Sequence, residues 1–424
     1  MVTNDYYTLA EFAALIGKSP ATLRKWDREG KLCAVREPIS NYRVYRKEQL
    51  QIFEELNMVK TPEVEGNFVK SNRDYKVIEL FAGAGGLAVG LEKAGLKCIA
   101  LNEIDHWAAE TLRVNRPKWN VIEKDIREVS FTEFEGKVDV VTGGFPCQAF
   151  SYAGKRLGFE DARGTLFYEF ARIVNEVKPA ICIGENVRGL LSHDDGRTLQ
   201  GMISILDELG YRVVPHRVLK AINFKVPQKR ERLILVGVRK DIIVNFEYPK
   251  PFKKIYPLTE ALKKGELFDC DVPKSAGARY PNWKKEILDL VPPGGYWRDL
   301  PEDLQKEYMQ ASYFLGGGKT GMARRISWDE PSLTLTCSPA QKQTERCHPD
   351  ETRPFTVREY ARIQTFPDDW KFAGSVSQQY KQIGNAVPVN LAKEIGYSII
   401  KFLNQYYGKP YFPKGHSSKK ALTS

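Results

Sequence analysis

The feature that most constrains the fold is a regular alternation of apolar, β-branched runs with amphipathic segments between Tyr75 and about Lys240. The apolar runs are typical of buried strands, and the amphipathic segments are typical of helices that cover a sheet. Strands that alternate with helices predict an α/β fold with a doubly wound, largely parallel sheet. The expected strands are 76–81, 97–102, 138–141, 180–184 and 233–238, and the expected helices are 86–94, 107–114, 165–177 and 198–209.

The first strand-to-helix turn is rich in glycine and reads Phe81-Ala82-Gly83-Ala84-Gly85-Gly86-Leu87-Ala88. It fits the Gly-x-Gly-x-x-Gly/Ala pattern, which lets the backbone approach a bound nucleotide closely. Glu103 follows about twenty residues later, where a carboxylate can bond ribose hydroxyls. Asp125 and Ile126 fall where a third strand would end, and they are a second expected contact. These residues predict a nucleoside-containing cofactor, but alone they leave NAD, FAD and S-adenosylmethionine open.

A second turn, Gly143-Gly144-Phe145-Pro146-Cys147, follows another expected strand. A turn of this composition lifts a thiol off the carboxyl end of the sheet, where open α/β folds bind ligands. A helix that begins just after the turn would favour the thiolate, which is the form that attacks. A lone cysteine is more often a small buried side chain. Here the glycine-rich turn upstream and Glu185-Asn186-Val187 downstream favour a catalytic role.

The N-terminal residues 1–60 are expected to form a separate winged helix-turn-helix. Thr8 and Glu11 form a capping box for a first helix, and a second helix begins at Pro20. Residues 41–46 are typical of a basic wing strand. The segment resembles MerR-type regulators and excisionases, although a small helical domain for protein contacts is the alternative. The expected DNA contacts of this segment are Thr22, Arg24, Lys25 and Arg43.

Composition narrows the class of protein. The formal net charge of +11 favours a polyanionic partner such as a nucleic acid. The seven cysteines are scattered and form no Cys-x-x-Cys pair, which argues against a disulfide framework and against a metal site. The longest apolar runs are too short to span a membrane, and the N-terminus lacks the pattern of a signal peptide. We therefore expect a cytoplasmic protein.

Several motifs, taken in order, resemble those of the DNA cytosine-5 methyltransferase family of prokaryotic restriction–modification systems. They are the turn at Phe81, Gly-Gly-Phe-Pro-Cys147-Gln, Glu185-Asn-Val, Gln228-Lys-Arg230-Glu-Arg232, the segment from Arg353 to Asp368, and Gly384-Asn385-Ala-Val387-Pro388. The resemblance spans residues 76–400. Three positions depart from the family pattern, namely Glu79, Lys124 and Val389.

The resemblance implies a role for each motif. Cys147 would be the nucleophile, Glu185 would bind the cytosine ring, and Arg230 and Arg232 would meet DNA phosphate or the flipped base. Further DNA contacts would come from Gln148, Ser151 and Arg358. The implied cofactor is S-adenosyl-L-methionine, and its expected contacts are Phe81, Gly83, Gly85, Gly86, Leu87, Glu103, Ile104, Asp125, Ile126, Pro146, Asn385 and Val387.

The same resemblance divides the chain into parts. We expect a Rossmann-like methyltransferase domain that a small, loop-rich target-recognition domain interrupts. The expected parts are the winged helix-turn-helix at 1–60, a linker at 61–74, the catalytic domain at 75–240, the recognition domain at 241–370, a return to the catalytic domain at 371–410 and a basic tail at 411–424.

The expected partners are double-stranded DNA and, as a genetic neighbour, a cognate restriction endonuclease. The protein itself is expected to be a monomer. Two alternatives remain open at this point. One is a cytosine-5 methyltransferase of tRNA, because a subgroup with that substrate shares these motifs. The other is a transcription regulator in which the N-terminal domain is the main functional part.

Overall fold

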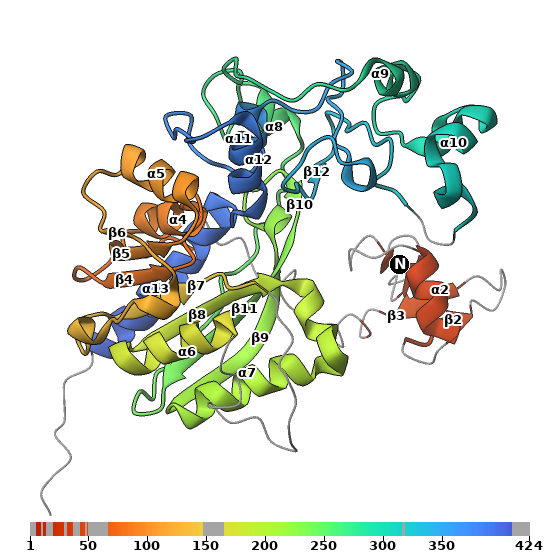
Figure 1. The fold of residues 1–424 in the computed structure, drawn as a ribbon. Coiled ribbons are helices and arrows are strands. Elements are labelled where there is room, and N and C mark those ends of the chain that lie inside the picture. Colours follow the sequence, from red (N-terminus) through yellow and green to blue (C-terminus); the bar gives the residue numbers. More distant parts are fainter. Residues whose placement is uncertain are drawn as a thin grey trace, which may run out of the picture. The chain divides into compact units, whose positions relative to one another are not determined.

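The computed structural model describes residues 6–9, 12–13, 20–28, 32–36, 43–46, 49, 67–146, 165–315 and 319–408 (Figure 1). The chain divides into two compact units, Met1–Gly66 and Asn67–Ser424. Each unit is built around an apolar core of its own.

The N-terminal unit combines a small sheet with a helix. Its three strands follow the order β1-β3-β2, and all pairs are antiparallel. The elements are β1 (Tyr6–Thr8), α2 (Pro20–Arg28), β2 (Val35–Arg36) and β3 (Arg43–Arg46). Phe12, Leu23 and Tyr45 are fully buried between them. The helix that begins at Pro20 and the basic wing strand are therefore confirmed, whereas the first expected helix is described only at Leu9, Phe12 and Ala13.

The second unit is organised by a seven-stranded sheet of order β6-β5-β4-β7-β8-β11-β9. The strands are β4 (Lys76–Leu80), β5 (Lys97–Glu103), β6 (Val121–Glu123), β7 (Val140–Gly143), β8 (Ile181–Val187), β9 (Tyr211–Lys220) and β11 (Glu231–Arg239). From β6 to β8 all neighbours are parallel, while β11 runs antiparallel to both β8 and β9. The predicted doubly wound, largely parallel sheet is confirmed.

Helices cover both faces of this sheet (Figure 1). One face carries α4 (Gly86–Ala94), α5 (His106–Asn115) and α13 (Val389–Tyr407), and the other carries α6 (Leu166–Val177) and α7 (Arg197–Glu208). Side chains alternate along each strand, so Val77 enters the first core and Ile78 the second. Each strand therefore contributes to two apolar layers, which explains its almost continuous apolar sequence.

Three elements beside the cavity and in the sheet were not among the expected strands and helices, although a third strand was expected to end near Asp125. Strand β6 has only three residues, and helix α12 (Val376–Asn385) carries mostly polar side chains. Strand β9 contains Pro215, which argues against a central strand. The structure places β9 at the edge of the sheet, and its register with β11 shifts between Ile234 and Val236, beside Pro215. A proline is tolerated at such a place because no ladder hydrogen bond is lost.

The region after β11 contributes in part to the first core, through α8 (Thr259–Leu262) and α11 (Val357–Ile363), and in part forms a third core of its own. Its other elements are α9 (Asn282–Asp289), η7 (Trp297–Asp299), α10 (Glu302–Met309), η8 (Gln310–Phe314), β12 (Ser332–Leu333) and η9 (Lys342–Thr344). Trp297, Tyr308 and Met309 are buried in the third core. A two-residue strand, β10 (Gln228–Lys229), pairs with β12 in parallel and joins the region to the sheet.

The expectation that this region is built from loops is only partly right. Helices α9 and α10 have eight residues each, which is too short for a clear helical period in the sequence. An ion pair between Lys284 and Glu345 lies in the interior, and the Tyr308 hydroxyl donates to the same carboxylate. These polar contacts fix the long connections where few apolar side chains are available.

Close contact between α4 and α13 provides a test of the packing. A Cβ added at Gly90 would lie 2.3 Å from the Ala392 Cβ and 2.6 Å from the Val389 carbonyl oxygen. Gly90→Ala should therefore destabilise the protein by about 1–3 kcal/mol, the usual range for overpacking. Urea unfolding followed by circular dichroism measures this loss. Gly189→Ala is the matched control, because its nearest neighbour would be 3.9 Å away, and an equal loss in both variants would contradict the argument.

Candidate active site

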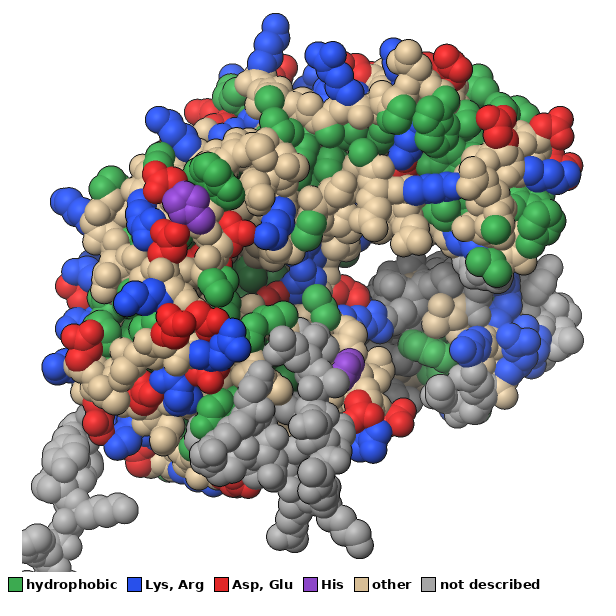
Figure 2. Space-filling model, viewed as in Figure 1, with side chains coloured by type: hydrophobic (Ala, Val, Ile, Leu, Met, Phe, Trp, Pro, Cys, Tyr) green, Lys and Arg blue, Asp and Glu red, His purple; other side chains and the backbone are tan. Residues whose placement is uncertain are grey.

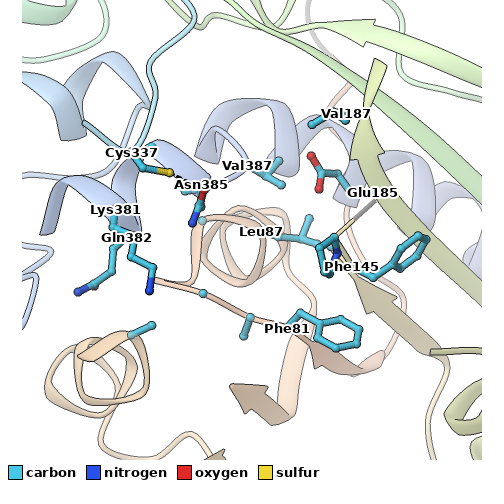
Figure 3. A pocket seen from close by; sticks show the side chains of 18 of the residues that line it. Phe81, Leu87, Phe145, Glu185, Val187, Cys337, Lys381, Gln382, Asn385 and Val387 are labelled. Carbon is cyan, nitrogen blue, oxygen red and sulfur yellow. Dashed lines mark hydrogen bonds between the residues drawn. The ribbon is translucent and has the colours of Figure 1, made fainter. Parts of the chain in front are cut away.

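A cavity of about 870 Å³ opens at the carboxyl ends of the parallel strands (Figure 2). Side chains from distant parts of the sequence line it, as Figure 3 shows. Phe145, Glu185 and Val187 lie toward one end, whereas Cys337, Lys381 and Gln382 lie toward the other. The position matches the edge of an open α/β sheet at which ligands bind.

The glycine-rich turn forms one wall of the cavity. It leaves β4 with Phe81 at φ 57°, Gly83 at φ 54° and Gly85 at φ 84°, so the chain turns through left-handed conformations. The Gly83 N–H donates to Glu103 Oε2 at 2.7 Å, and the Asp105 N–H donates to Glu103 Oε1 at 2.7 Å. Burial raises the pKa of Glu103 against these backbone hydrogen bonds. The Glu103 carboxylate therefore fixes the conformation of the turn at the carboxyl end of β5.

Two glycines of this turn are required for different reasons. A Cβ at Gly86 would lie 2.3 Å from the Val387 carbonyl oxygen, so only glycine lets the last motif pack on the start of α4. A Cβ at Gly83 would meet no atom within 4 Å, so the chain here is open. The turn thus combines tight packing on one side with an open cradle on the other, as a nucleotide-binding turn requires.

Most of the residues predicted to contact a cofactor line the cavity. They are Phe81, Gly83, Gly86, Leu87, Glu103, Ile104, Pro146, Asn385 and Val387. The open cradle at Gly83 and the buried Glu103 carboxylate fit a group that carries a ribose.

Gly85, Asp125 and Ile126 were also predicted to contact the cofactor, but they are not among the residues that line the cavity. Ile126 is buried in the second core. Asp125 accepts hydrogen bonds from the side chain and the N–H of Arg127, and the side-chain bond lowers the pKa of Asp125 to about 2. A third strand does end near these residues, but their side chains turn to local partners.

Glu185 and Arg232 form an ion pair at the other end of the cavity. Glu185 lies on β8 and Arg232 on the adjacent β11, and the Arg232 Nε is 2.6 Å from Glu185 Oε1. The two side chains are 12% and 11% exposed, so solvent screens the pair only weakly. Burial raises the pKa of Glu185, and the charges of Arg232 and Arg230 oppose this shift only in part. The carboxyl group is thereby suited to hold or to donate a proton.

The turn that leads to Cys147 is fixed from the β8 side. The Asn186 amide is buried and donates to the Phe145 carbonyl oxygen at 2.9 Å. Phe145 in turn packs on Phe167 and Phe170 of α6. The chain is thus held in place as far as Pro146. The predicted site residues Cys147, Gln148 and Ser151 lie outside the described residues.

Arg230 lines the cavity together with Arg232, but it is not part of a strand, in contrast to the prediction from the sequence. The two arginines were expected to alternate along one strand and to face phosphate or the base together. Arg230 instead lies between β10 and β11 and is 1% exposed. Its guanidinium donates to the Leu335 carbonyl oxygen at 3.1 Å and to that of Gly384 at 2.9 Å, and burial lowers its pKa to about 9. Strand alternation fails here because a regular strand does not include Arg230.

Two other predicted DNA-contact residues have partners within the protein. The Arg358 guanidinium donates to the carbonyl oxygens of Pro367 and Trp370, at 3.1 and 2.8 Å. Arg43 forms an ion pair with Asp27 at 2.6 Å. Arg24 and Lys25 of α2 are exposed, and Thr22 is half-buried.

Several cavity residues were not singled out as site residues in the sequence. Cys337 donates its thiol hydrogen to Asn385 Oδ1 at 2.9 Å, and the Lys381 Nζ lies 2.7 Å from Asp105 Oδ2. Glu79 is 2% exposed, and its Oε2 has no hydrogen-bond partner among the described residues. Burial raises the pKa of Glu79 well above its ordinary value, and the nearby Glu103 adds to the shift. Only Glu79 gave a sequence signal, as a departure from the family pattern.

Within the described part of the chain, no group of three or more His, Cys, Asp or Glu side chains is arranged to hold a metal ion. The described helices also include none with the length and apolar character needed to cross a membrane.

Two protein-family models match the chain. The model described as C-5 cytosine-specific DNA methylase matches residues 75–401, and the model described as MerR HTH family regulatory protein matches residues 7–60.

Curated Type II methyltransferases are similar to this chain over 80–95% of its length. The Type II methyltransferase M.Eco47II of Escherichia coli is 61% identical over 403 residues, which are 95% of this chain and 97% of that protein. M.PspPI of Psychrobacter sp. is 57% identical over 404 residues, with coverage of 95% and 97%. M.Sau96I of Staphylococcus aureus is 56% identical over 342 residues, with coverage of 80% and 78%.

Solved structures share the fold. A putative DNA modification methyltransferase encoded within an E. coli prophage has a TM-score of 0.55 at 21% identity, and the match covers 78% of this chain and 100% of that one. A DNMT2 mutant from Spodoptera frugiperda has a TM-score of 0.54 at 18% identity, with coverage of 77% and 99%. At these identities the likeness concerns the fold alone.

The raised pKa of Glu79 predicts a pH-dependent stability. The folded protein holds the proton more tightly than the unfolded chain, whose carboxyl titrates near 4.5. Glu79 should thus cause no loss of wild-type stability below that pH. The free energy of unfolding should fall as the pH rises toward the folded pKa. Glu79→Gln should remove this loss, so the variant should be more stable than wild type near pH 8, and the difference should shrink as the pH falls toward 4.5.

Urea unfolding of wild type and Glu79→Gln at several pH values measures the difference. The exposed Glu128 provides a control, because Glu128→Gln should change stability by less than about 0.5 kcal/mol at every pH. A pH-independent difference between Glu79→Gln and wild type would show that the carboxyl is not held protonated.

Proposed function

The chain belongs to the C-5 cytosine-specific DNA methylases and is a Type II DNA (cytosine-5-)-methyltransferase of the restriction–modification kind, and we propose that it acts through a covalent adduct between Cys147 and a flipped-out cytosine. One observation supports this proposal above the others. The Glu185–Arg232 ion pair and the glycine-rich turn at Phe81 share a single cavity. A cytosine and a nucleoside cofactor can therefore meet there.

The proposed chemistry begins on the cytosine ring. Carbon 5 is too weak a nucleophile to accept a methyl group directly, so the ring must first be activated. The Cys147 thiolate adds to carbon 6, and the displaced electron pair makes carbon 5 nucleophilic. After carbon 5 is methylated, loss of its proton to a base and release of the thiolate restore the aromatic ring and the free cysteine.

Glu185 stabilises the ring while the thiolate adds. Negative charge then builds at ring nitrogen 3, and a carboxyl group that donates a hydrogen bond or a proton there lowers the barrier. The raised pKa of Glu185 favours the protonated form that this step uses. Arg232, 2.6 Å from the carboxylate, keeps the group in one orientation and can itself donate to the base.

The other end of the cavity would hold the cofactor, S-adenosyl-L-methionine. Methyltransferases of this family use a methyl donor, and the bound cofactor would supply the methyl group. Glu103 would accept hydrogen bonds from ribose hydroxyls, and Phe81 and Ile104 would contact the adenine ring. Gly83 would let the backbone approach the ligand, because the position that a Cβ would take is open.

The substrate base must leave the duplex to enter this cavity. A cytosine that is stacked and paired cannot reach a thiol at the carboxyl end of the sheet, so the base is extruded at a cost of about a few kcal/mol. Residues 241–370 would read the duplex as the target-recognition domain, and basic side chains would bind phosphate in a salt-dependent manner. We also propose a monomer in the cytoplasm, with a cognate endonuclease encoded nearby.

The N-terminal unit is proposed to bind DNA separately. Residues 7–60 match the MerR regulator model, and the exposed Arg24 and Lys25 lie on α2, the second helix of the predicted helix-turn-helix. Arg43 would act less directly, because its ion pair with Asp27 ties the wing strand β3 to α2.

The target sequence is proposed to be that of M.Eco47II. The alignment with that protein spans 403 residues, so the region that reads the duplex is included in the 61% identity. Bisulfite sequencing of plasmid DNA from cells that express this protein should reveal one protected cytosine context, identical to the one found with M.Eco47II.

The same experiment tests the nucleophile. Cys147→Ala should abolish protection, because the variant lacks the thiol that forms the proposed adduct, whereas Cys33→Ala in the N-terminal unit should retain it. Protection that survives in Cys147→Ala would refute the covalent mechanism. If soluble wild-type protein protects no context in DNA, methyl transfer to tRNA becomes the reaction to measure.

Glu185→Gln tests the proton at ring nitrogen 3. This variant should lower kcat by about 10²–10⁴-fold, which is the usual contribution of a positioned acid or base. Wild-type kcat should fall as the pH rises above the pKa of Glu185, since the protonated form is the active one. Steady-state methyl transfer to duplex DNA measures both effects. Glu231→Gln, in an ion pair outside the cavity, serves as control, and an equal loss there would remove the assigned role.

A further inference from the structure

Cys337 occupies a place in the cavity for which the proposed chemistry gives no role. It lies in the segment that follows β12, after the main part of the recognition region, and its exposed side chain reaches the cavity. Figure 3 shows it beside Asn385 and Lys381, at the end away from Glu185. It is thus a second thiol in the reaction chamber, on the side proposed for the cofactor.

The thiol has a defined partner. The Cys337 Sγ donates to the Asn385 Oδ1 at 2.9 Å. An amide group has an acceptor at one end and donors at the other, so a donor fixed to the oxygen decides which way the amide points. The Asn385 nitrogen is consequently left to donate to a ligand in the cavity.

The backbone around this contact is held rigidly. A Cβ added at Gly384 would lie 2.3 Å from the Thr336 carbonyl oxygen, so the two segments touch main chain to main chain. The Arg230 guanidinium links the two segments, because it donates to the carbonyl oxygens of both Leu335 and Gly384. Because the two backbones are fixed relative to each other, the Cys337 thiol and the Asn385 amide are held close together.

A second observation indicates that this part of the cavity receives a polar ligand. The Arg230 Nε lies on a side chain that is 1% exposed, lines the cavity and has no hydrogen-bond partner in the described part of the chain. Buried donors of this kind are normally satisfied, so an acceptor is expected when the site is filled.

We propose that Cys337 is a positioning residue for the methyl donor. Its thiol orients the Asn385 amide so that the amide nitrogen donates to an acceptor oxygen of the bound nucleoside–amino acid cofactor. The inference rests on the proposed function, because it assumes that the cofactor occupies this end of the cavity.

Binding of S-adenosylhomocysteine to the full-length protein tests the proposal. Isothermal titration calorimetry should show that Cys337→Ala raises the Kd about three- to tenfold, as expected for one lost hydrogen bond. Cys337→Ser keeps a donor and should restore the affinity to within about twofold of wild type. Cys270→Ala is the matched control, because that exposed thiol accepts from Arg362 and does not line the cavity, and it should leave the Kd unchanged.

Two readouts separate positioning from a merely structural role. The thermal midpoint of Cys337→Ala should remain that of wild type, because an exposed thiol adds little packing. In an Asn385→Ala background, Cys337→Ala should cause no further loss of affinity, since the group that the thiol orients has gone. A separate, additive loss would overturn the proposal, as would equal weakening by Ala and Ser.

The outcomes also separate this inference from the proposed function. If wild-type protein does not bind S-adenosylhomocysteine, the cofactor assignment fails and the positioning role fails with it. If wild type binds and Cys337→Ala binds equally well, only the role of Cys337 is refuted.

Discussion

The buried guanidinium of Arg230 is the interaction on which the arrangement of the active site depends. Arg230 lies between β10 and β11, and its guanidinium donates to two carbonyl oxygens, one after β12 and one at the end of α12. These belong to segments more than a hundred residues downstream. This contact helps to fix the segment after β12 and the end of α12 relative to the start of β11. A charged group is buried here because three backbones converge and their carbonyl groups need a donor.

The cavity concentrates carboxyl groups whose ionisation burial opposes. Glu79 and Glu103 lie beneath the glycine-rich turn, and Glu185 lies at the far end. Burial raises the pKa of all three. Their partners differ, however. Glu103 accepts hydrogen bonds from two backbone N–H groups, and Glu185 forms an ion pair with Arg232. One oxygen of Glu79 has no hydrogen-bond partner among the described residues. The same residue type thus braces a turn, forms an ion pair or remains a buried acid, according to its neighbours.

The sequence predicted those parts of the molecule that local patterns determine. The main strands and helices of the sheet and the glycine-rich turn at Phe81 follow from periodicity, glycine spacing and motif order, whereas the ion pair of Glu185 with Arg232 was not predicted. Contacts that depend on long-range packing were not predictable. Nothing near Arg230 in the sequence indicates that its partners lie after β12 and at the end of α12. The contact of Asp125 with Arg127 is local, but the sequence did not show that this arginine would occupy the carboxylate. Cys337 became visible only when folding brought it to Asn385.

The long edge strand β9 has a consequence for the behaviour of the protein in a crowded cell. A ten-residue strand at the margin of a sheet offers a row of unpaired backbone groups on which the edge of another copy could assemble. Here that margin carries an exposed Pro215 beside the shift in register, with Arg212 and His216 exposed on either side. The proline removes a donor and the irregular register bends the strand, so intermolecular sheet growth meets an interrupted template. Pro215, which argued against a strand in the sequence, thus also makes the exposed edge of β9 a poor template for pairing with another copy.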